Sequence, residues 1–338
     1  MAYLRIREGG TLFPKDRCVV SFDGTHIAYT IKGRGEHVIA LCAGYCCPDN
    51  FWRYLAPALE RRYRVLIWNY RGCGVSGMPR EPGYRARNYT VEDFMLDRYA
   101  QDLKMILDHE DIREVALVGH SMGTQVCLEA YRLMPRRITA FASITGPYSS
   151  AIHTIYNTTF APRIFPLASF FLSKLPTAAV PAWRAIFRSP FPHPLAIRLG
   201  VLSEGTKAED MRPYYEHMAE MDPQVMLKMA QAMHMHTAED MLKRVKAPTL
   251  VIVGERDNFV PPWLGHVMAS RIPLAELITI PGGTHGTIVE FPKLINKAVV
   301  DFFDRCLTGK PGAVSLEAKR EARRARETAP AETGTLET

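Results

Sequence analysis

Long apolar runs and a secretory signal are both missing from this sequence of 338 residues. A helix that crosses a membrane needs about 20 predominantly apolar residues, and no apolar run of that length occurs. Residues 1–7 also lack the apolar segment of a secretory signal. We therefore expect a cytoplasmic protein with no integral membrane segment.

The seven cysteines show neither a disulfide framework nor a metal signature. Their number is odd and they are scattered, and no C-x-x-C spacing or nearby histidine completes a metal site at Cys46 and Cys47. His234 and His236 have no carboxylate at ligand spacing. We expect reduced thiols, no bound metal and no cofactor.

Charge of one sign is in modest excess, with 42 Lys and Arg against 35 Asp and Glu. The dense basic cluster at residues 319–326 is interleaved with glutamates, and no aromatic-basic pattern accompanies it. We therefore expect no nucleic-acid partner. Residues 309–338 contain almost no large apolar side chains, which predicts a disordered tail or a solvated helix.

The sequence does contain a regular alternation of apolar, β-branched runs with helix-like stretches. This alternation predicts an α/β fold with a mostly parallel sheet flanked by helices. Residues 23–25 carry a turn signal, which predicts a hairpin between the first two strands. Eight strands are predicted, over residues 18–22, 27–31, 38–42, 63–68, 115–118, 138–144, 249–253 and 276–280.

The alternation stops after the sixth predicted strand, where the sequence becomes helical in pattern and rich in proline, phenylalanine and methionine. We expect a helical cap at residues 147–240, inserted between two parts of one core at residues 1–146 and 241–308. The cap's apolar side chains are expected to line an apolar pocket and to form its own small core. This is favoured over a membrane role because its helices lack a Lys/Arg-rich polar face. The side chains are Phe165, Leu167, Phe170, Phe171, Leu172, Leu175, Trp183, Ile186, Phe187 and Phe191.

Ser121 is the candidate nucleophile. It lies in a G-x-S-x-G sequence at residues 119–123, between a predicted strand and a predicted helix. Glycines on both sides allow a sharp turn that exposes the serine hydroxyl above the sheet edge. His120, beside the serine, is expected to be structural.

Two further side chains follow later strands in the order required to activate a serine. Asp257 lies on a loop after the strand at 249–253, and His285 lies on a glycine-containing loop after the strand at 276–280. The histidine would take the serine proton, and the aspartate would orient the histidine. Glu255 is a rival acid, but it lies closer to the end of its strand.

An oxyanion hole needs two N–H donors directed at the carbonyl oxygen that becomes negative. The amide of Met122, directly after the serine, is one candidate. The other is the amide of Tyr45 in the loop after the third strand, where Gly44 allows the chain to turn. Gly44 can also be read as an ordinary turn glycine.

Five motifs in order resemble the α/β-hydrolase superfamily, in the group with a serine nucleophile and a helical cap. They are residues 41–52, 69–76, 119–123, 254–257 and 283–285, and the resemblance covers about residues 17–307. It implies the α/β-hydrolase fold and disfavours epoxide or carbon–halogen hydrolysis, which in such relatives use an aspartate nucleophile. Ala43 stands where many relatives have histidine, and Asn69 where many have aspartate.

These observations predict a carboxylesterase- or lipase-like serine hydrolase. Its partner would be a small, apolar acyl substrate with an ester, thioester or lactone bond, cleaved through an acyl-enzyme on Ser121. Three alternatives stay open: transfer of the acyl group to another acceptor, cleavage of a C–C bond next to a carbonyl, and a non-catalytic binding module on this fold.

Overall fold

The computed structural model describes residues 12–79, 89–150, 158, 160–174 and 180–309. Its centre is one eight-stranded sheet in the order β1-β2-β4-β3-β5-β6-β7-β8. The first pairings, β1 with β2 and β2 with β4, are antiparallel, and all others are parallel. All eight predicted strands are present: β1 Arg17–Val20, β2 His26–Lys32, β3 Val38–Cys42, β4 Arg64–Trp68, β5 Val115–His120, β6 Ile138–Ile144, β7 Thr249–Gly254 and β8 Ala275–Ile280.

The central strands β3, β5 and β7 are buried along their whole length because helices cover both faces of a parallel sheet. The predicted hairpin joins β1 to β2, and its Gly24 adopts a φ of 89° that favours glycine. Helix α1 packs on α11, α2 packs on α3, and α9 packs on β7 and β8. The flanking helices are α1 Leu55–Glu60, α2 Leu96–His109, α3 Met122–Leu133, α9 Pro262–Arg271, α10 Thr287–Glu290 and α11 Pro292–Thr308, and the 3-10 segments are Asn50–Trp52, Glu92–Phe94 and Glu239–Arg244.

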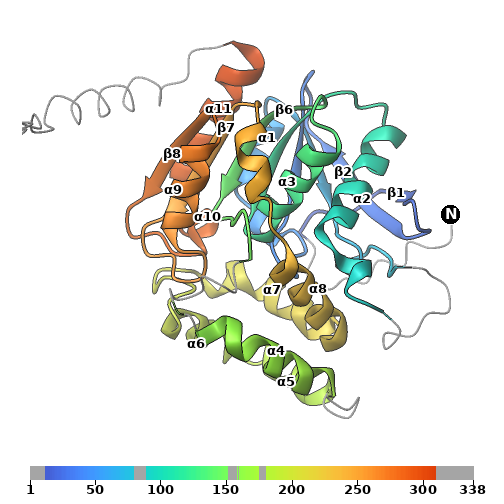
Figure 1. Ribbon diagram of the computed structural model, residues 1–338, viewed down its shortest axis with the longest axis vertical. Coiled ribbons are helices and arrows are strands. Elements are labelled where there is room, and N and C mark those ends of the chain that lie inside the picture. Colours follow the sequence, from blue (N-terminus) through green and yellow to red (C-terminus); the bar gives the residue numbers. More distant parts are fainter. Residues whose placement is uncertain (1–11, 80–88, 151–157, 159, 175–179, 310–338) are drawn as a thin grey trace, which may run out of the picture.

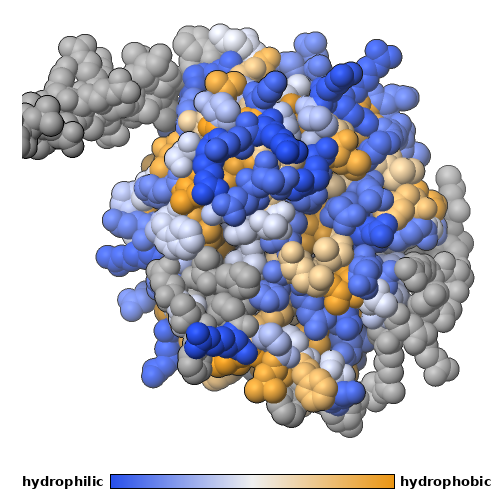
Figure 2. All heavy atoms as spheres, viewed as in Figure 1, coloured by the Kyte–Doolittle hydropathy of each residue, from blue (hydrophilic) through white to orange (hydrophobic). Residues whose placement is uncertain are grey.

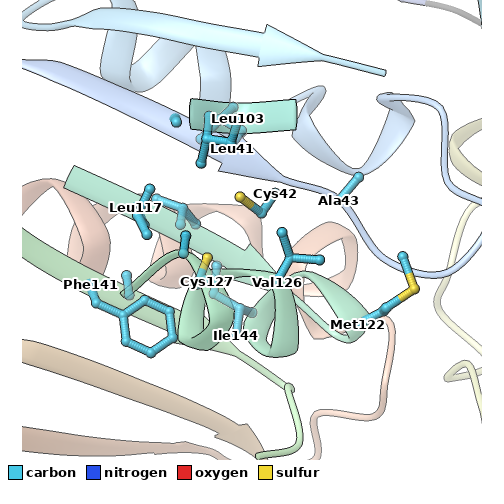
Figure 3. Close-up of a cluster of buried hydrophobic side chains, with 14 of the residues drawn as sticks. Leu41, Cys42, Ala43, Leu103, Leu117, Met122, Val126, Cys127, Phe141 and Ile144 are labelled. Atoms are coloured by element: carbon cyan, nitrogen blue, oxygen red, sulfur yellow. The ribbon is translucent and has the colours of Figure 1, made fainter. Parts of the chain in front are cut away.

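The core beneath the start of α3 is closely packed. Val126 and Cys127 of α3 lie with Cys42 of β3 and Leu117 of β5 in one cluster of buried side chains (Figure 3). Met122, at the first turn of α3, is also fully buried. This packing fixes the position of the residue at which β5 passes into α3.

The described residues between β6 and β7 form five α-helices, which gather at one end of the sheet (Figure 1). They are α4 Phe160–Ser173, α5 Val180–Arg188, α6 Pro192–Arg198, α7 Ala208–Glu220 and α8 Pro223–Met235, and we call them the insertion helices. Helix α4 contacts α8, and α5 contacts α7. The start of α8 is set by Asp222, whose side chain accepts the N–H of Gln224, and by Pro223 in its first turn.

One expectation for this region is wrong in part. Leu167, Phe170, Ile186 and Phe191 do not form a core, because at least half of each residue is exposed. Their expected place in the lining of a pocket stays a prediction. Trp183 and Phe187 are half-buried against the rest of the protein, as expected. Helical periodicity predicted an apolar face here, but it did not predict that water covers part of it.

Helix α11 ends at Gly309, which has the left-handed φ of 69° that is typical of a helix C-terminus. The predicted tail beyond it lies outside the described residues. Among the helices within the described ranges, none combines the length and apolarity that crossing a bilayer requires.

Candidate active site

Ser121 occupies a strained turn between β5 and α3. Its φ of 53° and ψ of −123° lie in a region that residues with side chains rarely adopt. Both flanking glycines are required by close approach of the main chain. A Cβ at Gly123 would lie 1.8 Å from the carbonyl oxygen of Cys42, and one at Gly119 would lie 2.6 Å from the main chain of Gly123.

His285 joins Ser121 to Asp257. Its Nε2 lies 2.9 Å from Ser121 Oγ, and its Nδ1 lies 2.9 Å from Asp257 Oδ2. The other oxygen of Asp257 accepts the N–H groups of Phe259 and Val260, at 2.9 and 2.8 Å. Because a carboxylate only accepts, Nδ1 donates to it, and the lone pair on Nε2 faces the serine hydroxyl. The structure therefore brings all three predicted residues together.

The rival acid Glu255 makes a different contact. Its Oε2 accepts the N–H of Gly282 at 2.8 Å, on the exposed side of the loop that precedes His285. Asp257 is fully buried beside the histidine ring, while Glu255 only supports the chain before it.

His120 supports the main chain of His285. Its Nε2 lies 3.4 Å from the carbonyl oxygen of His285, which the hydroxyl of Thr145 also approaches at 3.4 Å. The ring of Phe51 stacks on His120 with the ring centroids 4.7 Å apart. Burial lowers the pKa of His120 to about 3, with a smaller contribution from the neighbouring His285. His120 is therefore neutral near pH 7 and places no second positive charge beside His285.

The two predicted oxyanion donors border Ser121. Met122 is the first residue of α3, so its N–H has no acceptor within the helix. A Cβ at Gly44 would lie 3.4 Å from Ser121 Cβ and 3.1 Å from His120 Nδ1, so Gly44, the residue before Tyr45, lies beside the serine. Their part in catalysis stays a prediction.

Tyrosine hydroxyls hold this loop from two sides. The Tyr45 hydroxyl donates to the carbonyl of Met226 on α8 at 2.8 Å, and the Tyr70 hydroxyl donates to the carbonyl of Ala43 at 2.9 Å. At the other departure from the superfamily pattern, the fully buried Asn69 donates to Pro48 O at 3.2 Å and accepts from Val75 N at 3.3 Å. The amide thus spans two loops, because it can both donate and accept.

Glu290 was not identified from the sequence. One of its oxygens accepts the N–H of Ser203 at 2.7 Å and the hydroxyl of Thr206 at 2.9 Å, both between α6 and α7. The same carboxylate accepts the hydroxyl and the N–H of Thr284, at 2.6 and 3.1 Å. It therefore joins the loop of His285 to the insertion helices. No motif marks such a contact in advance.

The described residues contain no group of three or more His, Cys, Asp or Glu side chains placed to hold a metal ion. The side chains that meet at Ser121 are a hydroxyl, an imidazole and a carboxylate.

The model of a single protein family, described as alpha/beta hydrolase fold, matches residues 37–292. The chain belongs to this family. Curated relatives include proteins named "Putative carbamate hydrolase RutD". The one from Azorhizobium caulinodans is 25% identical over 275 residues, which are 81% of this chain and 93% of the relative. The one from Klebsiella pneumoniae is 26% identical over 270 residues, which are 79% of this chain and 91% of the relative.

Solved structures agree on the fold. A hydrolase from Pseudomonas aeruginosa superimposes with a TM-score of 0.66 at 21% identity, covering 85% of this chain and 97% of the other. The enol-lactonase from Burkholderia xenovorans superimposes with a TM-score of 0.62 at 20% identity, covering 85% of this chain and 99% of the other. An esterase from a Rhodococcus species gives 0.62 at 20% identity, covering 86% and 98%. The alpha/beta hydrolase fold predicted from the five sequence motifs is therefore confirmed.

Proposed function

We propose that this protein is a serine hydrolase that cleaves an ester, thioester or lactone bond in a small apolar substrate. The observation that carries the proposal is the continuous chain of two 2.9 Å contacts from Asp257 through His285 to Ser121. A serine hydroxyl becomes an effective nucleophile when a base in this geometry can accept its proton.

In the first half of the reaction, Ser121 Oγ attacks the substrate carbonyl while its proton passes to His285 Nε2. Asp257 stabilises the imidazolium that forms, and the amides of Tyr45 and Met122 hold the oxyanion. The intermediate collapses, the alcohol or thiol leaves with the proton from His285, and Ser121 carries the acyl group.

In the second half, a water molecule attacks the acyl-enzyme and gives its proton to His285. Collapse of this second intermediate returns the proton to Ser121 Oγ and releases the acid. If another acceptor replaced water, the same steps would transfer the acyl group instead.

Hydrolysis of a carbamate is a second candidate. The relatives from Azorhizobium and Klebsiella are named for it, and they cover most of this chain at 25% and 26% identity. A carbamate carbonyl can be attacked by the same serine.

Turnover of p-nitrophenyl esters of increasing chain length, with a p-nitrophenyl carbamate beside them, tests both candidates. We expect ester turnover that prefers longer acyl groups, and a fall in kcat of about a thousandfold or more in Ser121→Ala. Turnover by Ser121→Ala at the rate of the natural chain would contradict the proposal. Faster release from the carbamate than from every ester would favour the second candidate.

A further inference from the structure

The outer surface of the insertion helices carries apolar side chains that remain in contact with water. Ile164 is 46% exposed, Leu167 58%, Ile186 50%, Phe191 58% and Leu195 37%. Figure 2 shows apolar side chains gathered at the end of the molecule where α4 and α5 lie. We call these five residues the insertion patch.

On α4, the exposed apolar side chains do not result from poor packing, because other side chains of the same helix are packed against the protein. Phe165 and Ser169, one turn apart, face inward: Ser169 is buried, and the Phe165 ring lies 4.9 Å from that of His234 on α8. Ile164 and Leu167 face outward on the same helix. A surface helix normally turns polar residues to water, so an outward apolar stripe indicates a contact with something else.

The segment that carries the patch contains charges of one sign only, while α7, which packs on α5, carries the exposed acids Glu209, Glu216 and Glu220. Residues 160–199 contain five Lys and Arg and no Asp or Glu, and no acid occurs anywhere between Glu129 and Glu204. Arg163, Arg184 and Arg198 are exposed and form no ion pair within the described part of the chain. Arg188 does pair with Glu220 on α7. The sequence pattern argued against a membrane role because these helices lack a Lys/Arg-rich polar face. The structure shows instead that exposed arginines accompany the exposed apolar side chains on the same three helices, with no acid in that segment.

We propose that the insertion patch docks this protein on an anionic phospholipid bilayer. Shallow insertion of Leu, Ile and Phe into the interface, with Arg held at the level of the lipid phosphates, uses both properties of the patch. No described helix is able to span the bilayer, so the attachment is peripheral. A second copy is a poorer occupant, because a two-fold contact through this patch would bring its cations together without an acid to pair them.

The patch is connected to the candidate active site by two contacts. Helix α4 packs on α8, and the α8 carbonyl of Met226 accepts the hydroxyl of Tyr45 beside Ser121. Docking would therefore place the bilayer against the same helices that hold the oxyanion loop. The proposal concerns binding alone and does not depend on the reaction at Ser121.

Flotation with vesicles tests the proposal directly. We expect the full chain to bind vesicles of equal parts phosphatidylglycerol and phosphatidylcholine, and to bind pure phosphatidylcholine at least tenfold more weakly. The double variant Leu167→Ser/Phe191→Ser should bind the anionic vesicles at least tenfold more weakly, because it removes apolar surface that the bilayer would cover. Arg163→Gln and Arg184→Gln should each reduce binding about fivefold, and more salt should do the same.

Matched controls lie outside the insertion. Leu274 and Leu294 are as exposed as the patch residues, at 56% and 52%, so Leu274→Ser/Leu294→Ser should bind as the natural chain does. Arg113→Gln is the corresponding charge control, since Arg113 is also exposed. Circular dichroism and urea unfolding report the folding of each patch variant independently of the reaction at Ser121.

Failure of the natural chain to bind anionic vesicles would overturn the proposal, as would an equal loss in the patch and control variants. If the natural chain does not bind vesicles but forms dimers, and Leu167→Ser/Phe191→Ser is monomeric, the patch would instead be a contact with a second copy of the chain. Ser121→Ala should bind vesicles normally. A natural chain that binds vesicles but hydrolyses no ester would leave docking intact and count against the proposed function only.

Discussion

The residues of the site are fixed by close main-chain contacts. The left-handed conformation of Ser121 is held because Gly119 and Gly123 approach neighbouring backbone more closely than any Cβ would allow. The carbonyl of His285 is approached by His120 and Thr145. Residues held in this way lose little entropy when substrate binds, which favours catalysis.

The identity of the acid can be tested by a matched pair of substitutions on one loop. Asp257→Asn should lower kcat by about a hundredfold to ten-thousandfold, because an amide neither orients His285 correctly nor stabilises its positive form. Glu255→Gln should change kcat by less than about threefold, since Glu255 contacts Gly282 rather than His285. Ester kinetics with similar losses in both variants, or a larger loss in Glu255→Gln, would contradict this assignment.

His120 predicts part of the dependence of stability on pH. Burial lowers its pKa to about 3 in the folded protein, against about 6.5 in an unfolded chain. Below pH 6.5 the unfolded chain therefore binds a proton that the folded chain does not, and stability falls as the pH falls towards 3. By pH 5 this loss amounts to about 2 kcal/mol from His120 alone.

Urea unfolding of His120→Asn at pH 7 and pH 5 measures this contribution. The variant should lose about 2 kcal/mol less than the natural chain between the two pH values. Any constant cost of the substitution cancels in that difference. Equal losses in both proteins would show that His120 does not remain neutral in the fold.

At the scale of secondary-structure elements, the insertion helices support two of the loops that form the site. Helix α8 accepts the hydroxyl of Tyr45, and the segment between α6 and α7 donates to Glu290, which in turn holds Thr284. The loop that contains Tyr45 and the loop that contains His285 are therefore each in contact with an element that lies between β6 and β7. A movement of the insertion helices would therefore displace the loop of Tyr45 and the loop of His285.

Tyr45→Phe tests this support by removing one hydroxyl and leaving the main-chain amide in place. We expect kcat to fall about tenfold with little change in KM, because the loop loses its bond to Met226 while the apolar contacts persist. Tyr215→Phe on α7 is the matched control, since the buried Tyr215 hydroxyl has no partner among the described residues. An unchanged kcat in Tyr45→Phe would show that the hydrogen bond from Tyr45 to Met226 does not contribute to catalysis.

How far the sequence predicts these elements depends on the range of their contacts. The eight strands were predicted because β-branched runs and turn signals are local properties. The contact from Tyr45 to Met226 joins residues 181 positions apart, and Glu290 joins three segments, so no local pattern contains either. The meeting of Ser121, Asp257 and His285 was predictable because parallel strands end at one edge of the sheet.

At the scale of the whole molecule, the net charge of +7 is distributed unevenly along the chain. The chain from residue 130 to residue 203 has no acid, and it includes α4, α5 and α6 with their exposed apolar side chains. Sequence patterning treated these helices as core and pocket lining, because periodicity does not tell which face another element covers. The structure shows instead that α4, α5 and α6 expose apolar side chains and cations, whereas α7 beside them carries acids.

The central claim, that Ser121 is an activated nucleophile, is tested most directly by covalent labelling with a fluorophosphonate probe and mapping of the adduct by peptide mass spectrometry. The account predicts a single adduct on Ser121, no adduct in Ser121→Ala, and much slower labelling of His285→Ala, because the base that accepts the serine proton is then missing. An unlabelled natural chain, or equal labelling of Ser121→Ala, would contradict it.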